Sequence, residues 1–126
     1  MTNHPARVLL IEDDASLRDT LAEVLADEGH EVRSAPNGAI ALLQLRGWDA
    51  DVIVLDIMTP VMDAFEFRRQ QLAEDVAANA RILILSAGRE LQRAADRIGA
   101  DAWLPKPFRL LDVIETVERL ADDSAA

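Results

Sequence analysis

Polar side chains that could handle phosphate follow four separate apolar runs in this sequence. They are Asp56 after VIVL, Glu12-Asp13-Asp14 after VLLI, Ser86 after ILIL, and Lys106 after AWLP. Each has an ordinary explanation when it is taken alone. An acid after a strand often caps a helix, as Asp13 or Asp14 could, a serine often belongs to a turn, and a lone lysine is usually a solvated charge. Those explanations do not account for acids, a hydroxyl and an ammonium group that all follow strands.

The three acids Glu12, Asp13 and Asp56 define the chemistry if they lie together. Two unit charges 4 Å apart repel by about 4 kcal/mol at an effective dielectric constant near 20, so such a cluster must hold protons or bind a cation. Oxygen ligands with room for water favour Mg²⁺. Lys106 and Ser86 suit phosphoryl oxygens. Asp56 is then the natural nucleophile for a phosphoryl donor.

The rest of the sequence predicts an α/β domain that would bring these residues to one edge. Apolar runs alternate with helical periodicity, which indicates a parallel sheet with helices on both faces. Three of the runs show no polar alternation, as expected for strands covered on both sides. Ligands of such sheets bind outside the carboxyl ends of the strands. We expect strands at 7–11, 31–35, 51–55, 81–85 and 102–104, and helices at about 17–25, 39–45, 62 to 75–79, 89–98 and from 110.

Composition limits the remaining possibilities. The 126 residues suit one domain over 1–126, with a core at about 6–121 and a frayed tail at 122–126. The net charge of −10 disfavours direct binding of nucleic acid. No apolar run approaches a membrane span, the start lacks the apolar region of a signal peptide, and the absence of cysteine fits the cytoplasm. We interpret His4 and His30 as surface residues.

In combination, these motifs resemble the receiver domain of two-component response regulators, over about residues 7–120. The resemblance implies a flavodoxin-like (βα)5 three-layer sandwich with strand order 2-1-3-4-5. The matching segments are Ile11-Glu12-Asp13-Asp14, Val54-Leu55-Asp56-Ile57-Met58 with Pro60 and Met62-Asp63, Ser86-Ala87, Gly99-Ala100-Asp101, and Leu104-Pro105-Lys106-Pro107-Phe108.

The resemblance also implies a role for each site residue. Asp56 would accept a phosphoryl group from a phosphohistidine on a sensor histidine kinase or a phosphotransfer protein. Mg²⁺ would be bound by Asp13, by Asp56 and by the backbone carbonyl of Met58, with Glu12 holding a metal-bound water.

Further roles concern the phosphoryl group and the switch. Lys106 would contact the phosphoryl group, as would the backbone of Met58 and Ala87, and the Lys106–Pro107 peptide would be cis. Ser86 would move toward the phosphate, and Trp103 would follow as the switch aromatic. A downstream protein partner would bind the face of the fourth helix, fifth strand and fifth helix.

Several positions depart from the usual pattern of the family. Thr59 stands where an apolar residue is usual, Ala64 replaces a common glycine, and Trp103 replaces tyrosine or phenylalanine. Trp103 is either a half-buried packing residue or a ring that turns inward. Met58 either only shields the site or controls access of the hydrolytic water. The segment 86–106 is slightly short, which predicts a trimmed fourth helix or preceding loop.

Three alternatives differ in class. A degenerate receiver would act only as a docking module, independent of phosphorylation. A Mg²⁺-dependent aspartyl phosphohydrolase would normally carry a second Asp two residues after the nucleophile, where this sequence has Met58. A Rossmann nucleotide-binding domain would need a G-x-G-x-x-G after the first strand, and none is present. We therefore expect no enzyme with a separate substrate.

Overall fold

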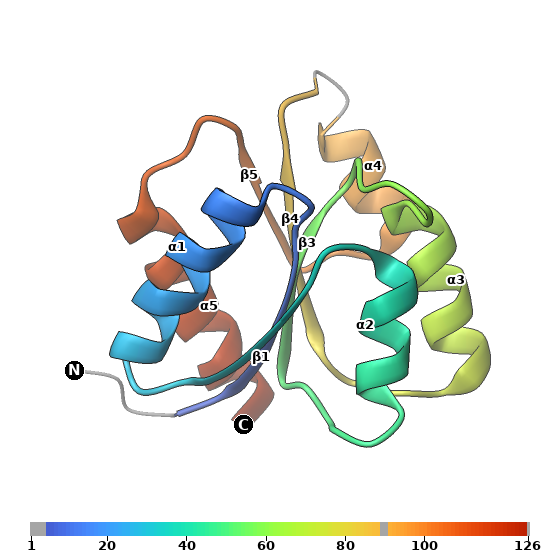
Figure 1. Cartoon of the computed structure of the whole chain (residues 1–126), viewed down its shortest axis with the longest axis horizontal. Helices are drawn as coiled ribbons and strands as arrows, with labels where there is room; N and C mark the ends of the chain where they lie inside the picture. Colours follow the sequence, from blue (N-terminus) through green and yellow to red (C-terminus); the bar gives the residue numbers. More distant parts are fainter. Residues whose placement is uncertain (1–4, 89–90, 126) are drawn as a thin grey trace.

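The computed structural model describes residues 5–88 and 91–125, which form a five-stranded parallel sheet with helices on both faces (Figure 1). The strand order is β2-β1-β3-β4-β5, which confirms the predicted flavodoxin-like arrangement. The strands are β1 Arg7–Ile11, β2 Glu31–Ala35, β3 Val52–Asp56, β4 Arg81–Ser86 and β5 Ala102–Pro105. The helices are α1 Ala15–Asp27, α2 Gly38–Leu45, α3 Ala64–Glu74, α4 Leu91–Ile98 and α5 Leu110–Ala125.

The sheet divides the hydrophobic core into two clusters. Helices α1 and α5 cover one face, and α2, α3 and α4 cover the other (Figure 1). Because successive side chains of a strand point to opposite faces, Val8 and Leu10 pack toward α1 and α5, while Leu9 and Ile11 pack toward α2 and α3. All four are fully buried. This two-sided burial explains why β1, β3 and β4 are nearly continuous apolar runs.

Side-chain caps start three helices soon after the strands that precede them. Asp14, Asn37 and Asp63 each accept a hydrogen bond from the backbone N–H three residues later, at 3.0–3.1 Å. Such caps satisfy donors that the first turn of a helix leaves free. The interpretation of Asp14 as a cap is thus confirmed. The caps Asp14 and Asn37 keep the loops at the carboxyl ends of β1 and β2 short.

Helix α3 differs from its prediction at both ends. It begins at Ala64 rather than near Met62, because Asp63 is its cap, and it ends at Glu74 instead of continuing to 75–79. Asp75 adopts the left-handed conformation with a φ of 55°, and its N–H is shared between the carbonyls of Gln71 and Leu72. That conformation terminates the helix, and the signal was missed because Asp is less typical there than Gly.

The start of α4 and the end of α5 lie at the limits of the described residues. Helix α4 is described from Leu91, so the predicted start at Arg89 lies outside the described residues. The backbone of α5 is helical as far as Ala125, and fraying of the tail at 122–126 stays a prediction.

The interpretation of His30 as a surface residue is wrong, and His4 lies outside the described residues. His30 is only 5% exposed and immediately precedes the edge strand β2. Its Nδ1 accepts a hydrogen bond from the Ala6 N–H at 3.1 Å, and its buried Nε2 has no hydrogen-bond partner among the described residues. The imidazole therefore packs beneath the chain as it enters β1. Neighbouring polar residues in the sequence concealed this burial.

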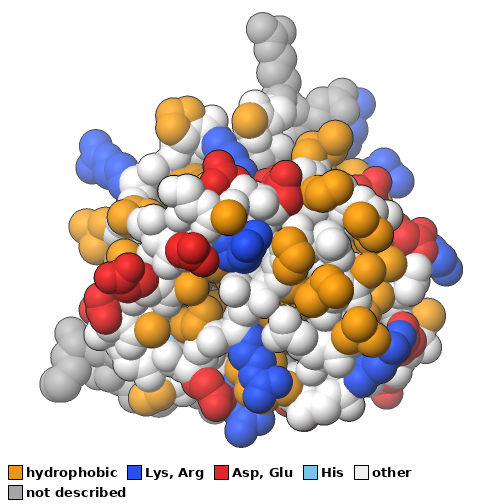
Figure 2. All heavy atoms as spheres, viewed as in Figure 1, with side chains coloured by type: hydrophobic (Ala, Val, Ile, Leu, Met, Phe, Trp, Pro, Cys, Tyr) orange, Lys and Arg blue, Asp and Glu red, His pale blue; other side chains and the backbone are white. Residues whose placement is uncertain are grey.

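The outer surface combines charge with a localised apolar area. Figure 2 shows hydrophobic side chains gathered on the side where Figure 1 places α2 and α3. On α2, Ile40 and Leu43 are 40% and 59% exposed. Within the described part of the chain, no helix combines the length and apolarity needed to cross a membrane.

Candidate functional site

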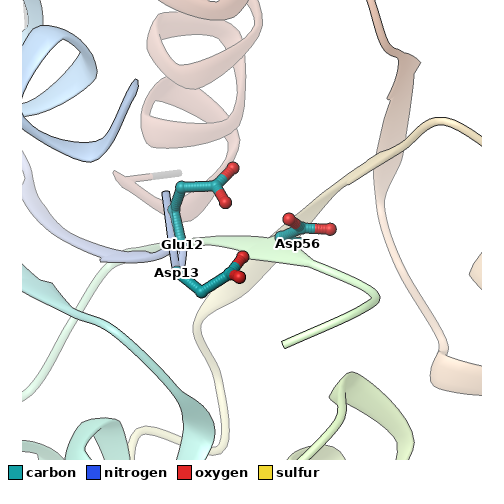
Figure 3. Close-up of side chains that lie close together, drawn as sticks. All are labelled: Glu12, Asp13 and Asp56. Atoms are coloured by element: carbon teal, nitrogen blue, oxygen red, sulfur yellow. The ribbon is translucent and has the colours of Figure 1, made fainter. Parts of the chain in front are cut away.

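The carboxyl ends of β1 and β3 bring three carboxylates together. The parallel register pairs Ile11 with Leu55, so Glu12, Asp13 and Asp56 follow at the same edge of the sheet. One oxygen from each lies within 4.8 Å of the others (Figure 3). Glu12 and Asp56 are buried at 1% and 6% exposure, whereas Asp13 is exposed. The rigid strands thus hold two acids inside the edge and a third at the opening.

Lys106 neutralises part of this cluster. Its Nζ lies 2.9 Å from Glu12 Oε1 and 2.9 Å from Asp56 Oδ2. Burial acts to lower the pKa of Lys106, but the hydrogen bonds and charges of Glu12 and Asp56 outweigh it, so the pKa is raised above its usual value. Lys106 is accordingly a fixed cation and not the solvated charge of the ordinary interpretation.

Backbone groups hold the lysine and the acids in place. The Lys106 N–H donates to the Ser86 carbonyl at 2.8 Å, and the Lys106–Pro107 peptide is cis, as predicted. The Met58 N–H donates to Asp56 Oδ1 at 3.2 Å. On the other side, Glu12 Oε2 accepts from the Asp14 N–H at 3.2 Å. Asp56 and Glu12 therefore each have one oxygen on Lys106 and the other on a backbone amide.

The donor set fits a hard divalent cation. Three carboxylates face one lysine, which leaves two negative charges uncompensated within the cluster. Among the described residues, the Asp13 carboxylate has no hydrogen-bond or ion-pair partner, and it lies at the solvent side of the site. Oxygen ligands, partial exposure and surplus negative charge together match the way in which proteins bind Mg²⁺.

A helix residue that the sequence did not single out supports the acidic loop. Arg18 on α1 donates through its guanidinium to the Glu12 carbonyl at 2.8 Å, with a longer contact of 3.4 Å to the Asp13 carbonyl. Arg18 therefore fixes the backbone that carries both acids. The separation of Arg18 from Glu12 along the sequence matches no known motif, so this contact was not predicted.

Ser86 forms a wall of a cavity beside Asp56. The serine is 6% exposed, and its Oγ accepts a hydrogen bond from the Gly88 N–H at 3.0 Å, which is the ordinary turn role. The cavity has a volume of about 390 Å³ and is also lined by Met58, Ala87 and Lys106. All residues expected around a phosphoryl group therefore border one space.

The loop between β3 and α3 accommodates the departures from the family pattern. Thr59 is 8% exposed, and its hydroxyl donates to the Met62 carbonyl at 2.7 Å, so a hydroxyl is satisfied where an apolar residue was expected. Ala64 is fully buried with ordinary helical geometry and needs no glycine. The unusual backbone lies instead at Val61, with a φ of 70°.

Met58 and Trp103, for which the sequence left two interpretations each, are both exposed at the surface. Met58 is 75% exposed and Trp103 is 40% exposed. Trp103 pairs with Ile84 across β4 and β5, which places it on the edge strand. Its exposure leaves the ring in contact with solvent. The sequence did not identify two apolar residues of the cavity, Phe65 and Ala94, which come from α3 and α4.

Comparisons with known proteins agree with this geometry. The family model of the response regulator receiver domain matches residues 8–118. Transcriptional regulatory protein TcrA of Mycobacterium tuberculosis is 33% identical over 120 residues, which cover 91% of this chain and 46% of TcrA. Response regulator MprA of Mycobacterium ulcerans is 32% identical, over 95% of this chain and 54% of MprA. The chain thus spans about half the length of these relatives.

Solved structures show the same similarity. Chemotaxis protein CheY4 of Vibrio cholerae has a TM-score of 0.84 and 32% identity, over 92% of this chain and 98% of CheY4. Response regulator TrrA of Thermotoga maritima, in complex with Mg²⁺-BeF, has a TM-score of 0.78 and 28% identity, over 90% of this chain and 97% of TrrA. From its matching family model, its fold and its acidic strand ends, the chain belongs to the receiver domains of two-component response regulators.

Proposed function

We propose that this protein is a phosphorylation-activated receiver that accepts a phosphoryl group on Asp56 with the help of Mg²⁺. One observation carries the proposal: Lys106 bonds both Glu12 and Asp56 at 2.9 Å, while Asp13 stays open beside them. A nucleophile, a fixed cation and a free metal ligand then share one opening. The donor is the phosphohistidine of a sensor histidine kinase or a phosphotransfer protein.

The residues divide into metal ligands and phosphoryl contacts. Asp13, Asp56 and the Met58 carbonyl would hold Mg²⁺ directly, and Glu12 would hold a water on it. When bound, the ion would offset negative charge on the phosphoryl oxygens as they approach the acids.

The phosphoryl contacts lie at the other side of Asp56. Asp56 supplies the attacking carboxylate oxygen. Lys106 keeps a positive charge there, because its pKa is raised. The backbone amides of Met58 and Ala87 supply donors at the wall of the cavity.

Phosphorylation would change the output face through Ser86 and Trp103. An acyl phosphate adds roughly one to one and a half negative charges to a site that already holds acids. Ser86 would exchange its bond with the Gly88 N–H for one to the phosphate, and the half-exposed Trp103 ring would follow inward. A protein partner would read the altered face of α4, β5 and α5.

The proposal assigns the chain no separate substrate. A phosphohydrolase would need an acid–base group near the leaving group, and Met58 occupies that position with a largely exposed side chain. The protein would thus catalyse only its own phosphorylation and dephosphorylation. Because a sensor kinase draws its phosphate from ATP, we expect the protein to work in the cytoplasm.

Intact-protein mass spectrometry after incubation with acetyl phosphate and Mg²⁺ tests the proposal. We expect one added phosphoryl group, absent from Asp56→Asn. Beryllofluoride with Mg²⁺ should bind the unmodified protein tightly, which covers the case of rapid hydrolysis. If neither a phosphoryl adduct nor a beryllofluoride complex forms, the protein is a docking module and the proposal is wrong.

A further inference from the structure

A groove of about 520 Å³ lies between α3 and α4, and its charged residues have no part in the proposed function. The two helices lie side by side on the same face of the sheet (Figure 1). The lining of the groove includes three arginines, Arg68, Arg69 and Arg97, and two acids, Asp63 and Glu66. It therefore occupies the side of α4 that faces α3, whereas the proposed output face includes the side toward β5.

The charge of this region differs from that of the rest of the chain. Residues 63–98 contain six basic and six acidic residues, so the other segments carry the whole net charge of −10. Screening at physiological salt limits the reach of an exposed charge to about 8 Å. An acidic partner that most of the surface would repel can therefore approach the protein here.

Three of the five charged side chains in the groove already have a partner. Arg69 is ion-paired with Glu66. The Asp63 carboxylate accepts a hydrogen bond from the Glu66 N–H and caps α3. Arg68 and Arg97 remain, and neither is ion-paired with any residue that the structure describes. The groove thus presents two positive charges that the protein itself does not neutralise.

Arg68 is held in a fixed position by uncharged acceptors. Its guanidinium donates to the Ile98 carbonyl at 2.9 Å and to Gln71 Oε1 at 2.8 Å. Burial lowers the pKa of Arg68, and the charge of Asp101 only partly opposes this effect. A half-buried cation without a counter-ion gains from a carboxylate that approaches it, because an ion pair becomes stronger as water is excluded.

Arg97 is held against an aromatic ring. Its guanidinium carbon lies 4.4 Å from the centroid of the Phe65 ring, which is the geometry of a cation–π contact. A guanidinium that is already stacked loses less conformational freedom when it binds a carboxylate through two parallel hydrogen bonds. Leu72 lines the same groove and is 50% exposed, so it adds apolar surface beside the two cations.

We propose that the groove between α3 and α4 docks a short acidic segment of a protein partner, with carboxylates on Arg68 and Arg97 and an apolar side chain on Leu72. A nucleic acid fits this surface less well, because its many phosphates would extend onto the acidic surroundings. The inference does not rest on the proposed function, since the unphosphorylated protein already presents the groove.

Selection from a phage-displayed library of random 16-residue peptides tests the inference, with the unmodified protein as bait. We expect the enriched peptides to carry at least two acidic residues together with a leucine-like residue. Their dissociation constants are then measured by fluorescence anisotropy. An exposed ion pair contributes up to about fivefold in affinity and a desolvated interface arginine about thirtyfold, so Arg97→Gln should weaken binding roughly five- to thirtyfold.

Matched variants separate the groove from general effects of charge and exposure. Arg33→Gln removes another exposed arginine, which stacks on the Trp48 ring at 4.7 Å outside the groove, and should change the dissociation constants less than twofold. Leu72→Gln should weaken binding roughly three- to fivefold, because half of a leucine side chain is available for burial. Leu43→Gln, at a 59% exposed position of α2, should leave it unchanged.

Salt dependence gives a second readout that a purely structural role of Arg97 would not change. Binding to the unmodified protein should weaken as the salt concentration rises, and it should do so less steeply in Arg97→Gln, which has lost one of the two cations.

Three results would overturn the inference. The first is a selection that enriches no peptide, or peptides no more acidic than the library. The second is equal affinity of the selected peptides for Arg97→Gln and for the unmodified protein. The third is binding of a single-stranded DNA 12-mer that depends on Arg97 where no peptide binds, which would assign the groove to nucleic acid. Labelling of Asp56 by acetyl phosphate is measured separately, so each of these results leaves the proposed function standing.

Discussion

Replacing Lys106 with methionine should destabilise the protein strongly when Mg²⁺ is absent. The substitution keeps most of the apolar stem but removes the charge that joins Glu12 to Asp56 at 2.9 Å on each side. Removing one partner of a buried ion pair costs roughly 3–5 kcal/mol, because the charge left behind is uncompensated. The Lys106 side chain is 24% exposed, so we expect a somewhat smaller loss of about 2–4 kcal/mol in the free energy of unfolding.

Urea denaturation measures this loss. At an m value of roughly 2 kcal/mol/M, the midpoint should fall by about 1–2 M. Saturating Mg²⁺ should recover much of the difference, because the ion supplies positive charge to the same carboxylates. In an Asp56→Asn background the cost of Lys106→Met should also be smaller, since one of the two acids is then neutral.

Two outcomes of the urea denaturation would contradict this prediction. If Lys106→Met unfolds within about 0.5 kcal/mol of the unmodified protein without Mg²⁺, the two contacts to Glu12 and Asp56 contribute little. A deficit that Mg²⁺ leaves unchanged would mean that the lysine acts through packing of its stem and not through its charge.

Three further predictions address the metal, the β3–α3 loop and a surface ion pair. Mg²⁺ at ten times its dissociation constant should raise the free energy of unfolding by about 1.4 kcal/mol. In thermal melts, Asp13→Asn should reduce this gain, whereas the exposed control Asp19→Asn should leave it unchanged. A gain in Asp13→Asn equal to that of the unmodified protein would exclude Asp13 as a ligand. Val61 has a φ of 70° and is 84% exposed, so Val61→Gly should stabilise the fold by about 0.5–1 kcal/mol by relieving left-handed strain. Val61→Ala retains that strain and should gain less in the same urea assay. No gain in Val61→Gly would show that the strain is negligible. Hydrogen bonds from Arg69 and then Gln70 lower the pKa of Glu66 to about 2, so its contribution to stability should be fully present above pH 4.5 and disappear as the pH falls toward 2. NMR titration of the Glu66 carboxyl group should show this low pKa in the unmodified protein and a clearly higher pKa in Arg69→Gln, where the Gln70 hydrogen bond remains. An ordinary pKa in the unmodified protein would contradict the ion pair.

The sequence predicted the architecture because its signals were local and redundant. Apolar runs such as Val52 to Leu55 indicate a strand buried on both faces, and parallel strands bring their carboxyl ends to one edge. Asp56, Glu12 and Lys106 could therefore be placed at one site without knowledge of any distance. Caps were predictable for the same reason, as Asp14 shows, because a cap depends on residues within one helical turn.

Features that depend on the packing of distant segments could not be predicted from local sequence signals. His30 stands among polar residues, and only the path of β1 beside it buries the ring. The end of α3 depends on Asp75 in a left-handed conformation, which Asp adopts less often than Gly. The cavity beside Asp56 joins Phe65 and Ala94 from different helices, and no spacing in the sequence relates them.

The division of the interior by the sheet has a consequence for how relatives of this protein diverge. The core beneath α1 and α5 and the core beneath α2, α3 and α4 share no side chain, although Leu9 and Leu10 are adjacent in the chain. A change of volume in one core must be compensated within that core. Across many homologous sequences, compensating substitutions should therefore form two separate groups that alternate along each strand. The face bearing the phosphoacceptor cavity could then adapt to new donors while the opposite face keeps its packing.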